Sequence, residues 1–124
     1  MRPAFSWRAA ATLLLLSMLA ACAGPQIFQG QLSSLDKGLS TLEVETRLTQ
    51  APLARHRVEL GARVFEIHAY RLNNGLQIDP YYLAYEQQRL VYWGYLNEFR
   101  RQPDRDLSQA VGQAQAPLQA AIKK

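Results

Sequence analysis

The chain has few of the residues that small secreted or metal-binding proteins use for stability. Its 124 residues include one cysteine and two histidines. One cysteine excludes an internal disulfide, and with two scattered histidines it does not complete a zinc site. The formal net charge is only +4, and no block of basic residues resembles a nucleic-acid footprint. We expect one domain with no metal, no cofactor and no nucleic-acid partner.

A membrane-spanning apolar segment is missing as well. The apolar run from Ala9 to Ala21 has thirteen residues, which is fewer than the ~20 that a spanning helix needs. The run follows Arg2 and Arg8, and this order is typical of a signal peptide. We predict that residues 1–21 form a signal peptide that is removed.

The position of the single cysteine offers a reason for its presence. Leu19, Ala20 and Ala21 precede Cys22, and together they resemble the lipobox of bacterial lipoproteins. The resemblance implies that a signal peptidase recognises Leu19, Ala20 and Ala21, and that Cys22 then carries palmitate-like acyl chains. Two or three such chains give stable anchoring. In that family Ala23 favours the outer membrane, and we expect the protein to face the periplasm. The alternative is an ordinary secretory signal with an incidental Cys22.

The mature chain is predicted to begin with a tether and a short helix. Residues 22–34 are rich in Gly, Gln and Ser, which favours a flexible lipidated tether. Ser40 and Glu43 then have the spacing of a capping box. The pattern predicts a helix over residues 41–49, since Pro52 prevents its continuation. The folded domain is expected to cover residues 35–101.

Residues 55–99 have the alternation and turn residues of two β-hairpins. The first turns near Gly61, and its second strand places Phe65, Ile67 and Ala69 on one face. Asp79-Pro80 predicts a break, and the second hairpin pairs Tyr81–Glu86 with Arg89–Phe99. A bulge at Gly94 would exchange the faces beyond it.

The last segment, residues 102–124, consists mostly of Ala and Gln. Alanine favours a helix, but Gly112 and Pro117 should interrupt it. We predict a tail that is partly disordered and partly helical.

The order of these segments resembles the small outer-membrane lipoproteins of the SmpA/OmlA (BamE-like) group over residues 32–100. The matching positions are Leu35, Gly38, Leu39, Ser40, Val44, Leu48 and Pro52. Thr49 replaces the expected glycine and Pro52 comes one residue late, which puts the helix C-cap in doubt because threonine accepts the left-handed conformation poorly.

The resemblance implies an α+β fold, with one or two short N-terminal helices packed on one face of a three- to four-stranded antiparallel sheet. The β-lactamase inhibitory proteins share this architecture. The apolar stripe of the helix consists of Leu39, Val44 and Leu48. It would cover strand residues such as Phe65, Ile67, Leu83 and Leu90, and the other sheet face would be more exposed.

Few side chains indicate catalysis. Glu66 lies two residues from His68 on one strand face, but no nucleophile in a suitable context accompanies the pair, and we interpret His68 as a polar residue on a solvated face. His56 and His68 are equally insufficient for a metal site. We therefore predict that the protein is not an enzyme.

The aromatic hairpin is the more informative feature. Half of its aromatic side chains must face the core, and the outward members could contact a partner protein or lipid headgroups. Our candidate partner surface is Tyr81, Trp93, Tyr95 and Arg89.

These patterns predict a membrane-anchored, non-catalytic envelope lipoprotein that binds an envelope protein, in outer-membrane assembly or integrity. The alternative is a ligand-binding or inhibitory module that uses an exposed sheet face, an idea that rests on fold analogy alone.

Overall fold

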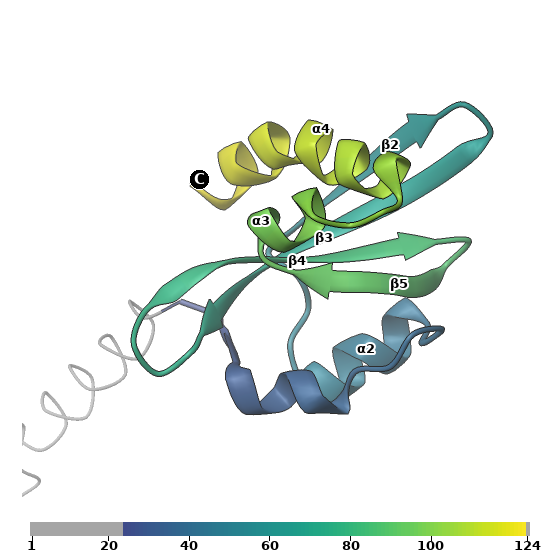
Figure 1. Ribbon diagram of the computed structural model, residues 1–124. Helices are drawn as coiled ribbons and strands as arrows, with labels where there is room; N and C mark the ends of the chain where they lie inside the picture. Colours follow the sequence, from purple (N-terminus) through teal and green to yellow (C-terminus); the bar gives the residue numbers. More distant parts are fainter. Residues whose placement is uncertain (1–23, 124) are drawn as a thin grey trace, which may run out of the picture.

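Strand β3 (Arg63–Asn73) lies at the centre of a five-stranded sheet that has helices on both sides (Figure 1). The computed structural model describes residues 24–123. The α+β prediction is confirmed. The other elements, in chain order, are β1 (Ile27–Phe28), the 3-10 helix η1 (Gln29–Ser34), α2 (Thr41–Leu48), β2 (Ala54–Leu60), β4 (Ile78–Glu86), β5 (Arg89–Gly94), α3 (Leu96–Arg100) and α4 (Arg105–Ile122).

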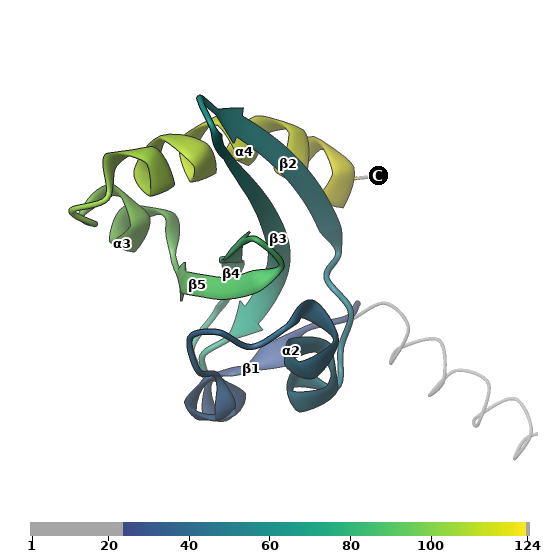
Figure 2. The same cartoon turned by 90° about the vertical axis from the view of Figure 1, so that its right-hand side faces the viewer.

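The sheet is mixed, whereas the sequence predicted an antiparallel one. Strands β2 to β5 form an antiparallel meander. Strand β1 runs parallel to β3, with Ile27 opposite Leu72 and Phe28 opposite Asn73. Both β1 and β2 therefore pair with β3, which bends strongly along its length (Figure 2).

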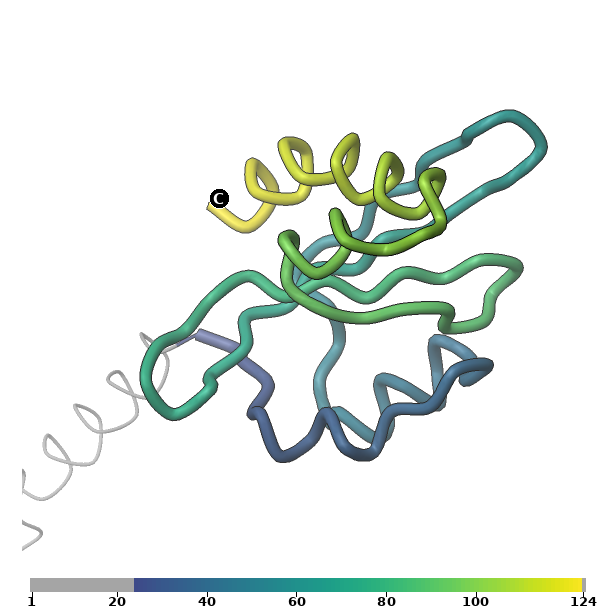
Figure 3. Tube along the Cα trace, viewed as in Figure 1, coloured from purple at the N-terminus to yellow at the C-terminus, as the bar shows by residue number. Residues whose placement is uncertain are grey.

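Both faces of the central strands are buried, which corrects the prediction of one exposed face. The chain path in Figure 3 has η1 and α2 on one side of the sheet and α3 and α4 on the other. The α4 side buries Phe65, Ile67 and Ala69, whereas the α2 side buries Tyr70 and Leu72. The stripe of α2 therefore packs on Leu83 and Leu90 as predicted, but not on Phe65 or Ile67. The α2-side cluster also contains Ile27, Leu35, Leu39, Val44, Leu48, Tyr81 and Tyr85.

Helix α2 begins and ends close to the predicted positions. The Ser40 hydroxyl accepts the backbone N–H of Glu43 at 3.2 Å, and the Glu43 carboxylate is 3.5 Å from the Ser40 N–H. The helix ends at Leu48, and Thr49 adopts the left-handed conformation with φ of 52°. The threonine is therefore accommodated where the family pattern expects glycine. Its hydroxyl donates to the Leu48 carbonyl at 2.7 Å.

Most of the predicted tether is folded. Ile27 is fully buried in the α2-side cluster, and β1 adds to the sheet. The Gln31 amide donates to the Leu48 carbonyl at 2.8 Å, which ties η1 to the end of α2. The composition of residues 22–34 suggested flexibility, but one buried isoleucine and a parallel pairing hold residues 27–34 in place.

The tail, predicted to be partly disordered and partly helical, is helical over most of its length as α4. Its buried residues recur at the spacing of one helix face and pack on the sheet. Gly112 and Pro117 lie on the exposed face of the helix. Pro117 has no N–H to donate, but the helix carbonyl that it leaves without a partner faces solvent and can bind water. The buried set is Leu107, Ala110, Val111, Ala114 and Leu118.

Two strand boundaries also differ from the predictions. Strand β4 continues through Asp79-Pro80 and pairs there with β3 alone. Strand β5 pairs with β4 only from Tyr82 onward, so Pro80 lies on an open edge, where its missing N–H costs no strand hydrogen bond. Strand β5 ends at Gly94, and α3 then turns Phe99 into the core. The register shift falls between Ala84 and Tyr85 of β4, not at Gly94.

We predict that Leu118→Ala lowers the free energy of unfolding by about 2–4 kcal/mol, because the fully packed side chain would leave a cavity between α4 and the sheet. Chemical denaturation of both proteins measures this change. Gln113→Ala, on the exposed side of the same helix, is the matched control and should change stability by less than about 0.5 kcal/mol. Equal effects of the two substitutions would show that α4 does not pack on the sheet.

Candidate functional site

The predicted lipidation site lies outside the described residues. Cys22 and the recognition residues Leu19, Ala20 and Ala21 all precede Gly24, where the description begins. Their roles therefore stay predictions that rest on the sequence.

The predicted aromatic partner surface is largely part of the core. Tyr81 is 5% exposed and its ring meets that of Tyr95 edge to face, with centroids 5.0 Å apart. Burial and nearby Glu98 raise the pKa of the Tyr81 hydroxyl. Trp93 and Tyr95 are half-buried beside the α2-side cluster. Tyr81 is thus removed from the candidate surface, and Trp93 and Tyr95 offer only part of their area to a partner.

Arg89 is exposed, but it serves the fold. Its guanidinium donates to the Gly38 carbonyl at 3.0 Å. Beside it, the backbone of Leu90 exchanges two hydrogen bonds of 2.8 Å with Gly38 and Leu39. The segment before α2 therefore pairs with β5 and covers part of its outer edge.

Strand β2 is the longer open edge. Within residues 24–123 its only strand partner is β3, although α4 packs across one of its faces. Its exposed side chains, Arg55, Arg57 and Glu59, alternate with less exposed ones. An edge of seven residues offers unpaired backbone groups to a strand from another protein. The sequence predicted this strand, but not that its outer edge stays open.

His68 is buried, which corrects its interpretation as a residue on a solvated face. Its side chain is 1% exposed, and its ring lies 4.6 Å from that of Tyr85. Neither ring nitrogen has a hydrogen-bond partner among the described residues, and the Tyr85 hydroxyl has none either. Its Nε2 is 3.4 Å from a Glu66 carboxylate oxygen, without the alignment of a hydrogen bond.

An open hollow lies above His68, between α2 and the sheet. Thr41, Leu42, Glu45, Arg55, Glu66 and His68 line it. Arg55 and Glu45 form an ion pair of 2.7 Å across it, joining β2 to α2. Desolvation lowers the pKa of His68, while the negative charge of Glu66 opposes this effect. Because both ring nitrogens are buried, His68 cannot exchange a proton with a molecule in the hollow unless side chains move.

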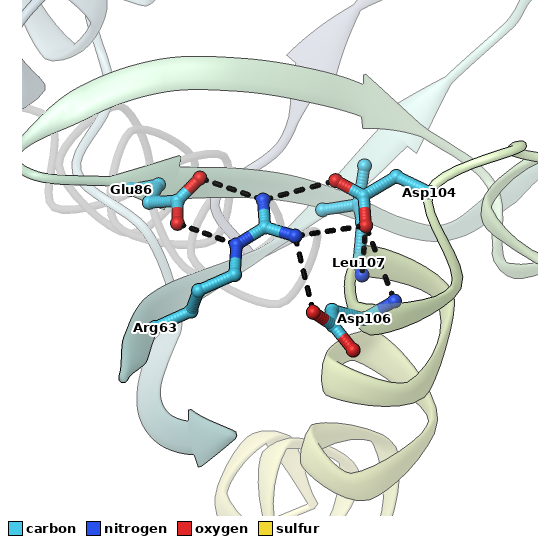
Figure 4. Close-up of polar contacts among 5 residues, drawn as sticks. All are labelled: Arg63, Glu86, Asp104, Asp106 and Leu107. Atoms are coloured by element: carbon cyan, nitrogen blue, oxygen red, sulfur yellow. Dashed lines mark hydrogen bonds and ion pairs between the residues drawn. The ribbon is translucent and has the colours of Figure 1, made fainter. Parts of the chain in front are cut away.

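The strongest charged cluster is centred on Arg63 (Figure 4). The guanidinium donates two hydrogen bonds of 2.8 Å to Glu86 and two, of 2.9 and 3.0 Å, to Asp104. Asp106 accepts a further one at 3.2 Å. Asp104 also caps α4, since it accepts the N–H groups of Asp106 and Leu107.

This cluster fixes the start of α4 against the sheet. The Arg63 guanidinium lowers the pKa of Glu86 and of Asp104. The carboxylates of Glu86 and Asp104 therefore stabilise the fold at pH values above the ordinary carboxyl pKa. This stabilisation is lost as the pH falls through their lowered pKa values. Solvent reaches the arginine, which limits the stabilisation. Three carboxylates already surround one guanidinium, so the cluster is unsuited to binding a further anion.

Residues 24–123 contain neither a cluster of metal-binding side chains nor a membrane-spanning helix. In the part of the chain that the structure describes, no three His, Cys, Asp or Glu side chains converge as metal ligands would. Among the same residues, none of the helices combines the length and hydrophobicity that crossing a bilayer requires.

Comparison with known proteins gives no relative: no family model, no curated protein and no solved structure matches the chain. The likeness to the SmpA/OmlA group therefore stays a prediction from the residues named above.

We predict that acidification destabilises the fold through His68. The pKa of His68 is lower in the folded protein than in the unfolded chain, so the unfolded chain binds a proton first as the pH falls. The fold is therefore fully stable above the ordinary histidine pKa and loses stability as the pH falls from there towards the pKa of folded His68. His68→Phe should reduce the loss of unfolding free energy between roughly pH 7.5 and roughly pH 5. Denaturant titrations at the two pH values measure it.

The other histidine supplies the control. His56→Phe leaves His68 and its neighbours unchanged, so the unfolding free energy should keep its full pH dependence. The neighbours are Glu66, Glu45, Arg55 and Tyr85. If His68→Phe and the unsubstituted protein lose the same stability on acidification, His68 is not the group responsible.

Proposed function

We propose that the protein is a lipid-anchored, non-catalytic envelope lipoprotein of a double-membraned bacterium, and that it acts as a protein-binding adaptor. The observation that carries the proposal is the placement of Cys22 directly after a short apolar run. The folded domain begins at Ile27, only five residues later, so an anchor at Cys22 would hold the domain next to the membrane. Acylation with two or three chains is enough for this attachment.

The proposed location is the periplasmic side of the outer membrane. Ala23 supports it through the lipoprotein pattern, and the SmpA/OmlA likeness supports a role in outer-membrane assembly or integrity. An α+β domain with a helix-covered sheet is compatible with that group.

The adaptor role needs a surface for a partner, and the outer edge of β2 suits it best. A partner strand would pair with its backbone, and the side chains of Arg55, Arg57 and Glu59 would select among partners. Charges on an edge strand also hinder unspecific pairing between copies. The inhibitory-module alternative needs an open sheet face. Buried clusters under α2 and α4 occupy both faces, so no observation favours it.

Metabolic labelling with palmitate tests the anchor. We expect label on the full-length protein expressed in a bacterium with a lipoprotein pathway, and no label on Cys22→Ala, because the thiol accepts the diacylglyceryl group. Ala23→Ser, one residue away, is the control that should keep its label. Equal labelling of Cys22→Ala and the unsubstituted protein would disprove lipidation at this cysteine.

Site-specific photo-crosslinking tests the adaptor role. A photoreactive side chain at Arg57, on the β2 edge, should give a reproducible crosslink to one envelope protein in living cells. The same group at Gln113, on the exposed face of α4, should not give that product. Identical products at both positions, or none at Arg57, would argue against docking at β2.

A further inference from the structure

The end of the sheet nearest the N-terminus exposes large apolar side chains. Leu76, in the turn between β3 and β4, is 94% exposed, and Ile78 and Phe28 are 48% and 52% exposed. We call these three residues the apolar tip. Exposed side chains of this size cost free energy in water, so a group of them at one end indicates a contact.

The strand register shows that two members of the tip share one face. Asn73 pairs with Phe28 on one side and with Ile78 on the other. Side chains of paired residues project from the same face, so Phe28 and Ile78 flank Asn73, about 10 Å apart. The neighbouring row, which contains Ile27 and Leu72, points to the opposite face and is buried.

The turn holds Leu76 in an outward position. The Asn74 side-chain oxygen accepts the N–H groups of Leu76 and Gln77, each at 2.9 Å. The Asn73 side-chain oxygen accepts the N–H of Gly75 at 2.9 Å. Gly75 has φ of 92°, which glycine adopts without strain. Because these bonds fix the backbone, Leu76 cannot fold back onto the sheet without breaking them.

The same end of the sheet receives the N-terminal segment. The Asn73 amide donates to the Gln26 side chain at 2.9 Å, and β1 follows directly (Figure 1). Covalent geometry keeps Cys22 within about 8 Å of Gly24. An acylated Cys22 would therefore place the membrane surface at the side of the molecule that carries this end of the sheet and the C-terminal end of α4, far from the β2–β3 turn (Figures 1 and 2).

From this juxtaposition we infer that the apolar tip inserts Leu76, Ile78 and Phe28 into the lipid interface next to Cys22. The inference rests on the proposed lipid anchor, and its occupant is the bilayer itself. The acyl chains hold the protein at the membrane, and the tip fixes its orientation by burying apolar side chains at the boundary between headgroups and chains. The β2 edge then stays accessible to other proteins.

The test uses the full-length protein, lipidated in the cell and reconstituted into vesicles of phosphatidylethanolamine and phosphatidylglycerol with no other protein. Acylation occupies Cys22, so Leu76→Cys carries one reactive thiol for a fluorophore. Leu42→Cys is the matched control, because Leu42 is a 72% exposed leucine on α2. A quencher attached to the lipid acyl chains reports the depth of each label. Melting temperatures of both variants should be unchanged, since neither leucine is buried.

We expect the lipid-borne quencher to act severalfold more strongly on the label at position 76 than on that at position 42. Equal quenching on vesicles that carry the protein would overturn the insertion and leave the anchor intact. Protection of position 76 only in native envelope membranes, and not in protein-free vesicles, would assign the tip to a protein partner and also overturn it. A protein that lacks acyl chains and does not float with the vesicles would refute the anchor and, with it, the insertion.

Discussion

The structure depends on one constraint: β3 and β4 are apolar on both faces. Phe65 and Ile67 need cover on one side, and Leu72 and Leu83 need it on the other. Burying only one row would leave the other in water, at a cost of about 25 cal/mol for each Å². The chain meets this need from its two ends. Residues 27–48 cover one face, and α3 and α4 cover the other.

Strand β3 also links the charged cluster that fixes α4 to the end of the sheet that carries the apolar tip. At its start, Arg63 joins β4 to the capped N-terminus of α4. At its end, Asn73 holds the segment that follows Cys22 and begins the turn that presents Leu76. One strand therefore connects the helix that completes the core to the end of the sheet that we place at the membrane.

Local signals in the sequence predicted the local structure well. The Ser40 and Glu43 pair marked the start of α2, and Gly61 marked the turn between β2 and β3. The errors concern contacts between distant segments. Nothing near Ile27 indicated that it would pair with Leu72, and nothing near Pro117 indicated that α4 would continue through it. His68 was misplaced because the strand was assumed to have one exposed face.

The candidate functional residues show the same contrast between local signals and contacts between distant segments. The role of Cys22 is predicted from a lipobox, which is a local pattern, and it stays a prediction because Cys22 lies outside the described residues. The partner surface depends on which side chains the fold buries. Tyr81 was chosen as an outward aromatic residue, and β3 and Tyr95 enclose it. The open edge of β2 follows from the topology of the whole sheet, so no single segment indicates it.

The anchor is the central claim, because the location of the protein and the orientation of its tip both follow from it. Intact-mass spectrometry of the protein extracted with detergent from its host's membranes tests it most directly. We predict the mass of a chain that begins at Cys22 and carries a diacylglyceryl group with or without a further acyl chain. The mass of an unmodified chain, whether full-length or cleaved elsewhere, would contradict the account.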